Sequence, residues 1–366
     1  MRIVIIRTNT GDFGKVGTYN VQEIGLANAL MKMGHKVNVL FLHKETNRIL
    51  SDNTYKFVYY LPHKSIGLHG IFDVRILDRF KPDRIILFSD NQLWAKNVIM
   101  WCRKKSIPCI QYMGGVLSDN PGWLHQFYTK LILIRNIKSY HYSINAAKTT
   151  RVKNEMIKHK IPFSRVISIG LDAELLSEKK SPDLETKKEL HYSPNDKIIL
   201  FVGRIIDYKK PFLACDIAKK MHKEDSNYKL ILIGKGPLQK QLKDYIRENK
   251  MNSFIEYIER VPYEEMYKYM VASDCLINLS SKEIFGMTIL EAMYYGLPVV
   301  AHKAPGPNDV IDNGKNGILC NTDDVNIWCA LIEKGIKRKD FLGNNARQTI
   351  KQEYLWDSIA NEFVKL

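Results

Sequence analysis

The chain has 366 residues, which is long enough for two domains that each bury a core of their own. With 45% hydrophobic and 26% charged residues, its composition is that of an ordinary folded protein and excludes a largely disordered chain. The net charge of +16 is uneven, because residues 1–176 hold 26 Lys and Arg against 12 Asp and Glu. This imbalance predicts an anionic partner for the first half.

The cysteines and the hydropathy indicate the cellular compartment that the protein is expected to occupy. The six cysteines include no C-x-x-C pair, so we expect buried free thiols in a reducing compartment rather than disulfides or metal ligands. No run approaches the ~18 apolar residues of a membrane span, and we expect a cytoplasmic protein. No nucleic-acid-binding signature accompanies the basic first half, so we favour an anionic membrane surface as its partner.

The first half predicts alternating strands and helices. Residues 3–6 are expected to form a strand, which a glycine-rich turn ending at Gly17 connects to a helix over 19–33. Glycines at such a place let the backbone approach a ligand at the helix N-terminus, although a tight turn without a ligand is the alternative. Further strands are expected over 36–42, 84–88 and 109–112, with a helix over 93–104. This alternation predicts an α/β fold with a doubly wound parallel sheet.

The segment 121–142 is basic, aromatic and amphipathic. Its large apolar residues recur at three- and four-residue steps, flanked by Lys130, Arg135 and Lys138; they are Trp123, Leu124, Phe127, Leu131 and Ile134. One interpretation is an interfacial helix that lies on anionic lipid. The other is a helix whose apolar face packs into the core of the first domain.

A second domain is expected to follow a charged, proline-containing stretch over 177–196. It opens with a strand over 197–202, after which come Arg204, Lys209 and Lys210. An arginine at the carboxyl end of a strand and a lysine five residues later can place two cations on one pyrophosphate. Lys210 is the fallback if the loop is shifted, and surface salt bridges are the alternative reading.

The stretch from 275 to 301 predicts a strand, a loop, a helix from Thr288 and another strand. Glu291 is a carboxylate inside an apolar run, where an unpaired charge would be costly. Phe285 and Gly286 open the helix, where free N–H groups and the helix dipole favour an anion. Parallel sheets bind ligands beyond the carboxyl ends of their strands, so this loop predicts a site.

Glu283 and Glu291 are separated by seven residues. Together with the Arg204-x4-Lys209 spacing and a G-x-G-P turn at Gly234, this arrangement resembles the retaining glycosyltransferase family 4. The resemblance implies the GT-B fold, in which two Rossmann-like doubly wound α/β domains face each other across a cleft. It places residues 1–176 in an acceptor-side domain, residues 177–349 in a nucleotide-sugar-binding domain, and a C-terminal helix over 350–366 back on the first domain.

The resemblance also implies an activity and a site. The protein would transfer a sugar, with retention, from a nucleotide-diphosphate sugar (UDP favoured) and without a metal or other cofactor. Arg204 and Lys209 would neutralise the leaving diphosphate, and Glu283 would bind hydroxyls of the donor sugar. Further donor-binding residues would be Glu291 at the ribose, Phe285, Gly286, Met287, Thr288, Gly17, Gly234, Arg260, Val261 and Lys210.

Two positions depart from the family pattern. Met113 stands where many members have a histidine near the donor sugar, and Gly17 is followed by Thr18 instead of a second glycine. The basic first half favours a lipid-linked saccharide acceptor at the inner face of the cell membrane, as in capsule, lipopolysaccharide or wall-polymer synthesis. The alternative, motivated by Met113, is a non-catalytic GT-B protein that binds another glycosyltransferase.

Overall fold

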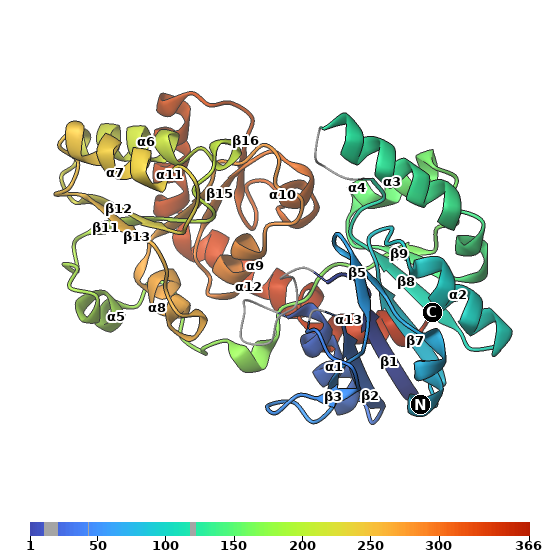
Figure 1. Cartoon of the computed structure of the whole chain (residues 1–366). Helices are drawn as coiled ribbons and strands as arrows, with labels where there is room; N and C mark the ends of the chain where they lie inside the picture. Colours follow the sequence, from blue (N-terminus) through green and yellow to red (C-terminus); the bar gives the residue numbers. More distant parts are fainter. Residues whose placement is uncertain (11–20, 43, 118–121) are drawn as a thin grey trace. The chain divides into compact units, whose positions relative to one another are not determined.

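The computed structural model describes residues 1–10, 21–42, 44–117 and 122–366 (Figure 1). The chain divides into two compact units. The first unit contains residues 1–172 and 355–366, and the second contains residues 173–354. Gly17 lies outside the described residues, as do the other glycines of the expected N-terminal turn.

The first unit is built on an eight-stranded sheet with the order β10-β9-β8-β7-β1-β2-β4-β3. Only the β3–β4 pair is antiparallel. The central strands are runs of branched apolar residues that are buried on both faces, as a covered parallel sheet requires. Their bounds are β1 (Arg2–Arg7), β2 (Lys36–Phe41), β3 (Leu50–Ser51), β4 (Val58–Tyr60), β7 (Arg84–Phe88), β8 (Cys109–Met113), β9 (Ile144–Ala147) and β10 (Arg165–Val166).

Helices cover both faces of this sheet. One face packs against the 3-10 helix η1 (Val74–Phe80) and against α2 (Ala95–Lys104), α3 (Trp123–Asn136) and α4 (Thr150–Lys158). The other face carries α1 (Gln22–Lys32) and α13 (Trp356–Val364). A short 3-10 helix, η2 (Ser139–Tyr142), follows α3, and an antiparallel hairpin of β5 (Lys64–Ile66) and β6 (His69–Ile71) stands apart from the sheet.

The last helix belongs to the first unit because Trp356 fills a slot that two glycines leave open. A Cβ on Gly25 would lie 2.3 Å from the Trp356 ring, and one on Gly170 would lie 2.7 Å from it. The C-terminal helix that the resemblance implies over 350–366 begins at Trp356 and ends at Val364. The chain leaves helical geometry at Tyr354 and Leu355, where Leu355 pairs with Leu171 as an isolated bridge.

The second unit has a six-stranded, fully parallel sheet with the order β13-β12-β11-β14-β15-β16. The strands are β11 (Lys197–Val202), β12 (Tyr228–Ile233), β13 (Ile255–Ile258), β14 (Cys275–Asn278), β15 (Val299–His302) and β16 (Ile318–Cys320). The helices are α5 (Leu184–Glu189), α6 (Pro211–Glu224), α7 (Gln239–Glu248), α8 (Tyr263–Ala272), α9 (Met287–Tyr294), α10 (Pro305–Val310), α11 (Val325–Lys337) and α12 (Lys339–Glu353).

The core of the second unit lies between one face of this sheet and the helices α6, α7 and α11. The opposite face is covered by α8 and α9. All six cysteines are buried and unpaired, as the apolar runs around them indicated. Among the described residues, no helix is long and apolar enough to span a bilayer.

Candidate functional site

The loop between β14 and α9 places Glu283 at the carboxyl edge of the second sheet. The Glu283 carboxylate forms an ion pair with the Lys209 ammonium, and it also accepts a 3.1 Å hydrogen bond from the Asn278 side chain. The two charged side chains are only 17% and 14% exposed, so each needs the other to compensate its lost hydration. The structure therefore brings together two residues that the sequence assigned to different parts of a donor.

Arg204 lies on the loop after β11, on the same sheet edge. Its guanidinium donates to the Tyr208 hydroxyl at 3.3 Å, the side chain is exposed, and no carboxylate of the described residues forms an ion pair with it. Arg204 and Lys209 therefore sit on one short loop, one cation exposed and the other held by Glu283. An arginine with an open fork beside a lysine is suited to a diphosphate.

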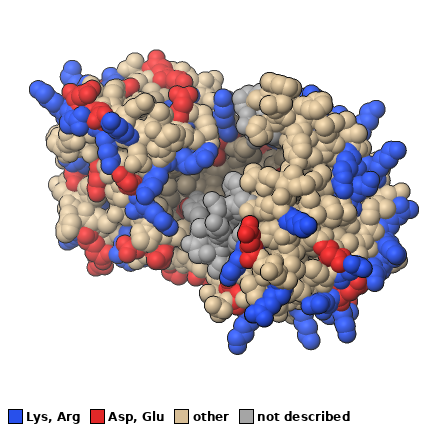
Figure 2. All heavy atoms as spheres, viewed as in Figure 1, with Lys and Arg blue, Asp and Glu red and all other residues tan. Residues whose placement is uncertain are grey.

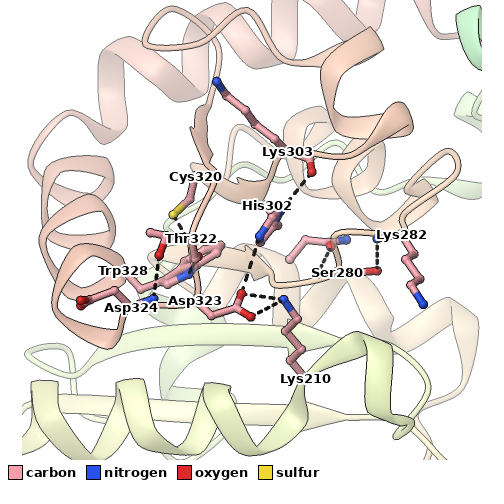
Figure 3. Close-up of polar contacts among 11 residues, drawn as sticks. Lys210, Ser280, Lys282, His302, Lys303, Cys320, Thr322, Asp323, Asp324 and Trp328 are labelled. Carbon is pink, nitrogen blue, oxygen red and sulfur yellow. Dashed lines mark hydrogen bonds and ion pairs between the residues drawn. The ribbon is translucent and has the colours of Figure 1, made fainter.

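Lys210 points to a different partner from Lys209. Its backbone is left-handed, with φ of 56°, and Pro211 then starts α6. The Lys210 ammonium lies 2.6 Å from an Asp323 oxygen, and His302 Nε2 approaches the same oxygen at 3.6 Å (Figure 3). Asp324, the neighbour of Asp323, caps α11 by accepting from the Asn326 N–H at 2.7 Å. Lys210 thus does not join the Arg204–Lys209 pair in this structure.

Gly286 starts α9 in a conformation that favours glycine. Its φ is 85°, and a Cβ at this position would lie 2.9 Å from the Ile289 side chain. No described side chain caps this helix, so the N–H groups of Met287 and Thr288, at the end where the Glu283 loop joins the helix, have no intrahelical partner. A Cβ on Gly306 would lie 2.4 Å from the Phe285 carbonyl oxygen, so α10 packs directly on this loop.

Glu291 is 2% exposed and lies in α9, where residues 289–294 are all buried. The Tyr263 hydroxyl donates to its carboxylate at 3.3 Å. Burial, with a smaller effect from the Glu291 charge, raises the pKa of the Tyr295 hydroxyl well above its usual value. A small pocket of about 10 Å³ opens beside the carboxylate, lined by Leu175, Leu176, Tyr263, Glu264, Met266, Tyr267, Met270, Glu291 and Tyr295.

Two further loops end at the same edge of the second sheet. Gly234 has a φ of 150°, and a Cβ there would overlap the Gly203 carbonyl oxygen at 1.8 Å. The absence of a side chain therefore allows the loops after β11 and β12 to pack backbone against backbone. Arg260, which is exposed, and Val261, which is half-buried, lie between β13 and α8. Every proposed donor-binding residue in the described part of the chain thus lies in the second unit.

The corresponding edge of the first sheet carries a buried lysine that the sequence analysis missed. Lys148 follows β9, is 7% exposed, and lies over the rings of Phe88 and Tyr112 at 5.1 and 4.9 Å. Its ammonium donates to Gln22 at 3.2 Å, and burial lowers its pKa despite the nearby Asp90 charge. A lysine directly after the short strand Ile-Asn-Ala-Ala was the signal in the sequence.

The structure shows what surrounds Met113 and Gly114, where a histidine of the family pattern would stand. The Met113 side chain is fully buried in the core of the first unit. Gly114 donates its N–H to Asp90 at 2.5 Å, and a Cβ there would lie 2.9 Å from the Asp90 carboxylate. A side chain at position 114 would therefore require the Asp90 carboxylate to move, and the polar side chains beside this glycine are Asp90 and Lys148.

Residues 183–355 match the family model described as glycosyl transferases group 1. A curated relative, an uncharacterised glycosyltransferase of Methanocaldococcus jannaschii, is 23% identical over 96% of this chain and 94% of its own length. The alpha-monoglucosyldiacylglycerol synthase of Acholeplasma laidlawii is 22% identical over 82% of this chain and 80% of its own. These matches support a glycosyltransferase.

The fold comparison covers both units. The crystal structure of Anabaena HepE in complex with UDP matches 100% of this chain and 99% of its own, with a TM-score of 0.75 and 18% identity. The chain has the GT-B fold.

Proposed function

We propose that the protein is a retaining glycosyltransferase that moves a sugar from a nucleotide-diphosphate sugar, with UDP as the favoured nucleotide. The observation that carries this proposal is the convergence of Arg204, Lys209 and the uncapped start of α9 on one edge of the second sheet. Three features of this kind would stabilise the charge that develops on a leaving diphosphate. The solved structures with UDP bound to HepE support the choice of nucleotide.

The remaining contacts fit the donor. Glu283 would bind hydroxyls of the sugar, and the Lys209 ammonium that it now holds would turn towards phosphate oxygens. Glu291, beside its pocket, would accept hydrogen bonds from the ribose diol. In this scheme the departing phosphate removes the acceptor proton, and the expectation of a reaction without a metal stays a proposal.

Calorimetric titration of the whole chain with UDP, GDP and ADP tests the donor site. We expect UDP to bind, and Arg204→Ala to weaken its binding at least tenfold. Arg247→Ala is the matched control, because Arg247 is an exposed arginine of the same unit that pairs with Asp244 on α7. If no nucleotide binds, or if the two variants bind UDP equally, the proposed donor site is wrong. The result would then favour the alternative, a non-catalytic GT-B protein that binds another glycosyltransferase.

We further propose a saccharide acceptor linked to lipid, in the synthesis of a cell-surface polysaccharide. The excess of basic residues over 1–176 supports it, as does a relative whose name describes a diacylglycerol product. Incubation of the enzyme with labelled donor and bacterial membranes should place label in the organic extract. Label confined to the aqueous phase would contradict the lipid linkage, and the anomeric coupling constant of the product would test retention.

A further inference from the structure

The helix α3 exposes a continuous face of large apolar side chains. Trp123 is 74% exposed and Ile134 is 70% exposed, and four further residues of the same helix are exposed between them: Leu124, Phe127, Tyr128 and Leu131. The opposite side of α3 packs into the first unit through Ile132, Leu133 and Asn136. The hypothesis that this apolar stripe packs into the core is therefore wrong, because α3 buries other residues instead.

A second element extends this face. The hairpin of β5 and β6 exposes Ile66 and Leu68 at its tip, and the ring of His69 lies 5.6 Å from that of Tyr128. Backbone hydrogen bonds fix the hairpin, since Gly70 donates to the Thr8 carbonyl at 2.9 Å. We call the exposed apolar residues of α3 together with Ile66 and Leu68 the α3 face. Large apolar patches of this kind on a soluble surface mark interaction sites.

The charges around the α3 face are of one sign. The helix contains no Asp or Glu, Lys130 and Lys138 are exposed at its side and end, and residues 93–160 hold twelve Lys and Arg against two Asp and Glu. Figure 2 shows that Lys and Arg are more frequent than Asp and Glu over the visible surface of the first unit. A second copy of the chain would bring equal positive charges together, whereas a surface of anionic lipid would neutralise them.

We propose that the α3 face is a membrane-docking surface, which inserts Trp123, Phe127 and Ile134 into the interfacial region of an anionic bilayer. Trp and aliphatic side chains on one helix face, beside Lys side chains that can reach the headgroups, are the composition of an interfacial helix. The inference deepens the proposed function and rests on it, since it names the surface where a lipid-linked acceptor would be met.

Flotation of the whole chain with vesicles tests this proposal without nucleotide or acceptor. The vesicles contain phosphatidylcholine alone, or phosphatidylcholine with 30% phosphatidylglycerol, at about 0.1 M NaCl, where charges act over roughly 10 Å. We expect binding to the anionic vesicles, reduced at least tenfold in a Trp123→Ser/Phe127→Ser/Ile134→Ser variant. The matched control is Ile327→Ser/Phe341→Ser, which replaces exposed apolar residues of the second unit and should bind as wild type.

A spectroscopic readout separates insertion from loose electrostatic attachment. Trp123 is the one exposed tryptophan among the described residues, whereas Trp94 is half-buried and Trp101, Trp328 and Trp356 are buried. Its emission should shift to the blue when anionic vesicles are added, and a Trp123→Phe variant should lose this shift while it still floats. The Lys130→Gln/Lys138→Gln variant should float more weakly than wild type. At high lipid concentration its Trp123 emission should still shift to the blue.

Three results would overturn the proposal. They are wild-type protein that stays at the bottom of the gradient with anionic vesicles, a triple variant that floats as wild type, and a Trp123 emission unchanged by vesicles. Analytical sedimentation without lipid tests the alternative that a second copy of the chain binds the α3 face. A wild-type dimer that becomes a monomer in the triple variant would assign the face to that second copy. A protein that binds UDP but no vesicles would leave the donor site intact and reject only this inference.

Discussion

The Lys209 ammonium and the Glu283 carboxylate form an ion pair although 74 positions separate them in the sequence. They meet because β11 and β14 are neighbours in the second sheet, so the loops that follow them leave the same edge. The pair links the cation proposed for the diphosphate to the carboxylate proposed for the sugar. A donor that binds both side chains must break the Lys209–Glu283 ion pair and replace it with its own contacts to each residue.

Replacement of the two partners should therefore have different effects. Lys209→Met removes a charged donor to the diphosphate, worth about 1.5–3 kcal/mol, and should weaken UDP binding roughly ten- to a hundredfold. Glu283→Gln frees Lys209 and should leave UDP affinity within about threefold, while turnover falls by about 10²–10³. Calorimetry and initial rates measure the two effects. Equal loss of UDP binding in both variants would mean that Glu283 only orders the lysine.

The start of α9 gives a second test. Gly286→Ala should lower the free energy of unfolding by about 1–2 kcal/mol, because alanine is disfavoured in the left-handed backbone of this position. The close contact of the new Cβ with Ile289 should lower it further, and the variant should lose UDP binding. Gly314→Ala is the matched control, because Gly314 has nearly the same φ of 83° and an open surrounding. This control should lose only the stability that the left-handed backbone costs an alanine, and its UDP affinity should be that of wild type. Equal UDP affinity in the two variants would argue against a ligand at the start of α9.

The buried Lys148 predicts a pH dependence of stability. Burial lowers its pKa below the unfolded value of about 10.4, so between the two values the unfolded chain binds more protons than the folded one. The contribution of Lys148 to stability therefore rises with pH across that window. We expect the melting temperature of wild type, relative to Lys148→Met, to increase from pH 7 to pH 10. A difference that stays constant would contradict a lowered pKa.

A second buried pair holds α5 to the sheet of the second unit. The Lys187 ammonium lies 2.8 Å from an Asp274 oxygen that also accepts the Ile198 N–H at 2.9 Å, and both side chains are buried. Lys187→Met leaves the carboxylate unpaired and should cost about 3–5 kcal/mol in urea unfolding. Adding Asp274→Asn should recover part of this loss, because the amide oxygen can still accept from Ile198.

The control for this pair is Lys220→Met. Lys220 pairs with Glu224 on the exposed side of α6, where water and salt screen the pair and leave it little effect on stability. A loss in Lys187→Met no larger than in Lys220→Met would show that water reaches the Lys187–Asp274 pair.

Much of the fold follows from local pattern. The runs at 3–6, 84–88 and 197–202 are buried strands with the expected bounds to within about two residues, because strands buried on both faces are continuous apolar runs. The β3–β4 edge and the β5–β6 hairpin over 50–71 were missed. Their strands have two or three residues, too few to show a period, and tertiary contacts decide their pairing.

The site could be predicted as a set of residues but not as a set of contacts. Gly286 and the buried Glu291 follow from the loop and the helix that carry them. The Lys209–Glu283 pair and the separate Lys210–Asp323 pair depend on which loops share a sheet edge, and the left-handed turn at Lys210 decides between them. The burial of Lys148 and the exposure of the α3 face likewise depend on tertiary packing, which cannot be inferred from the spacing of residues in the sequence.

The placement of α13 in the first unit has a consequence for biosynthesis. A ribosome translates residues 173–354, the whole second unit, before it reaches the Trp356 that fills the slot at Gly25 and Gly170. Until α13 docks, the first unit exposes the sheet face that this helix covers, so the folding of the first unit waits for translation of the second. The first unit thus begins translation before the second unit and is completed after it.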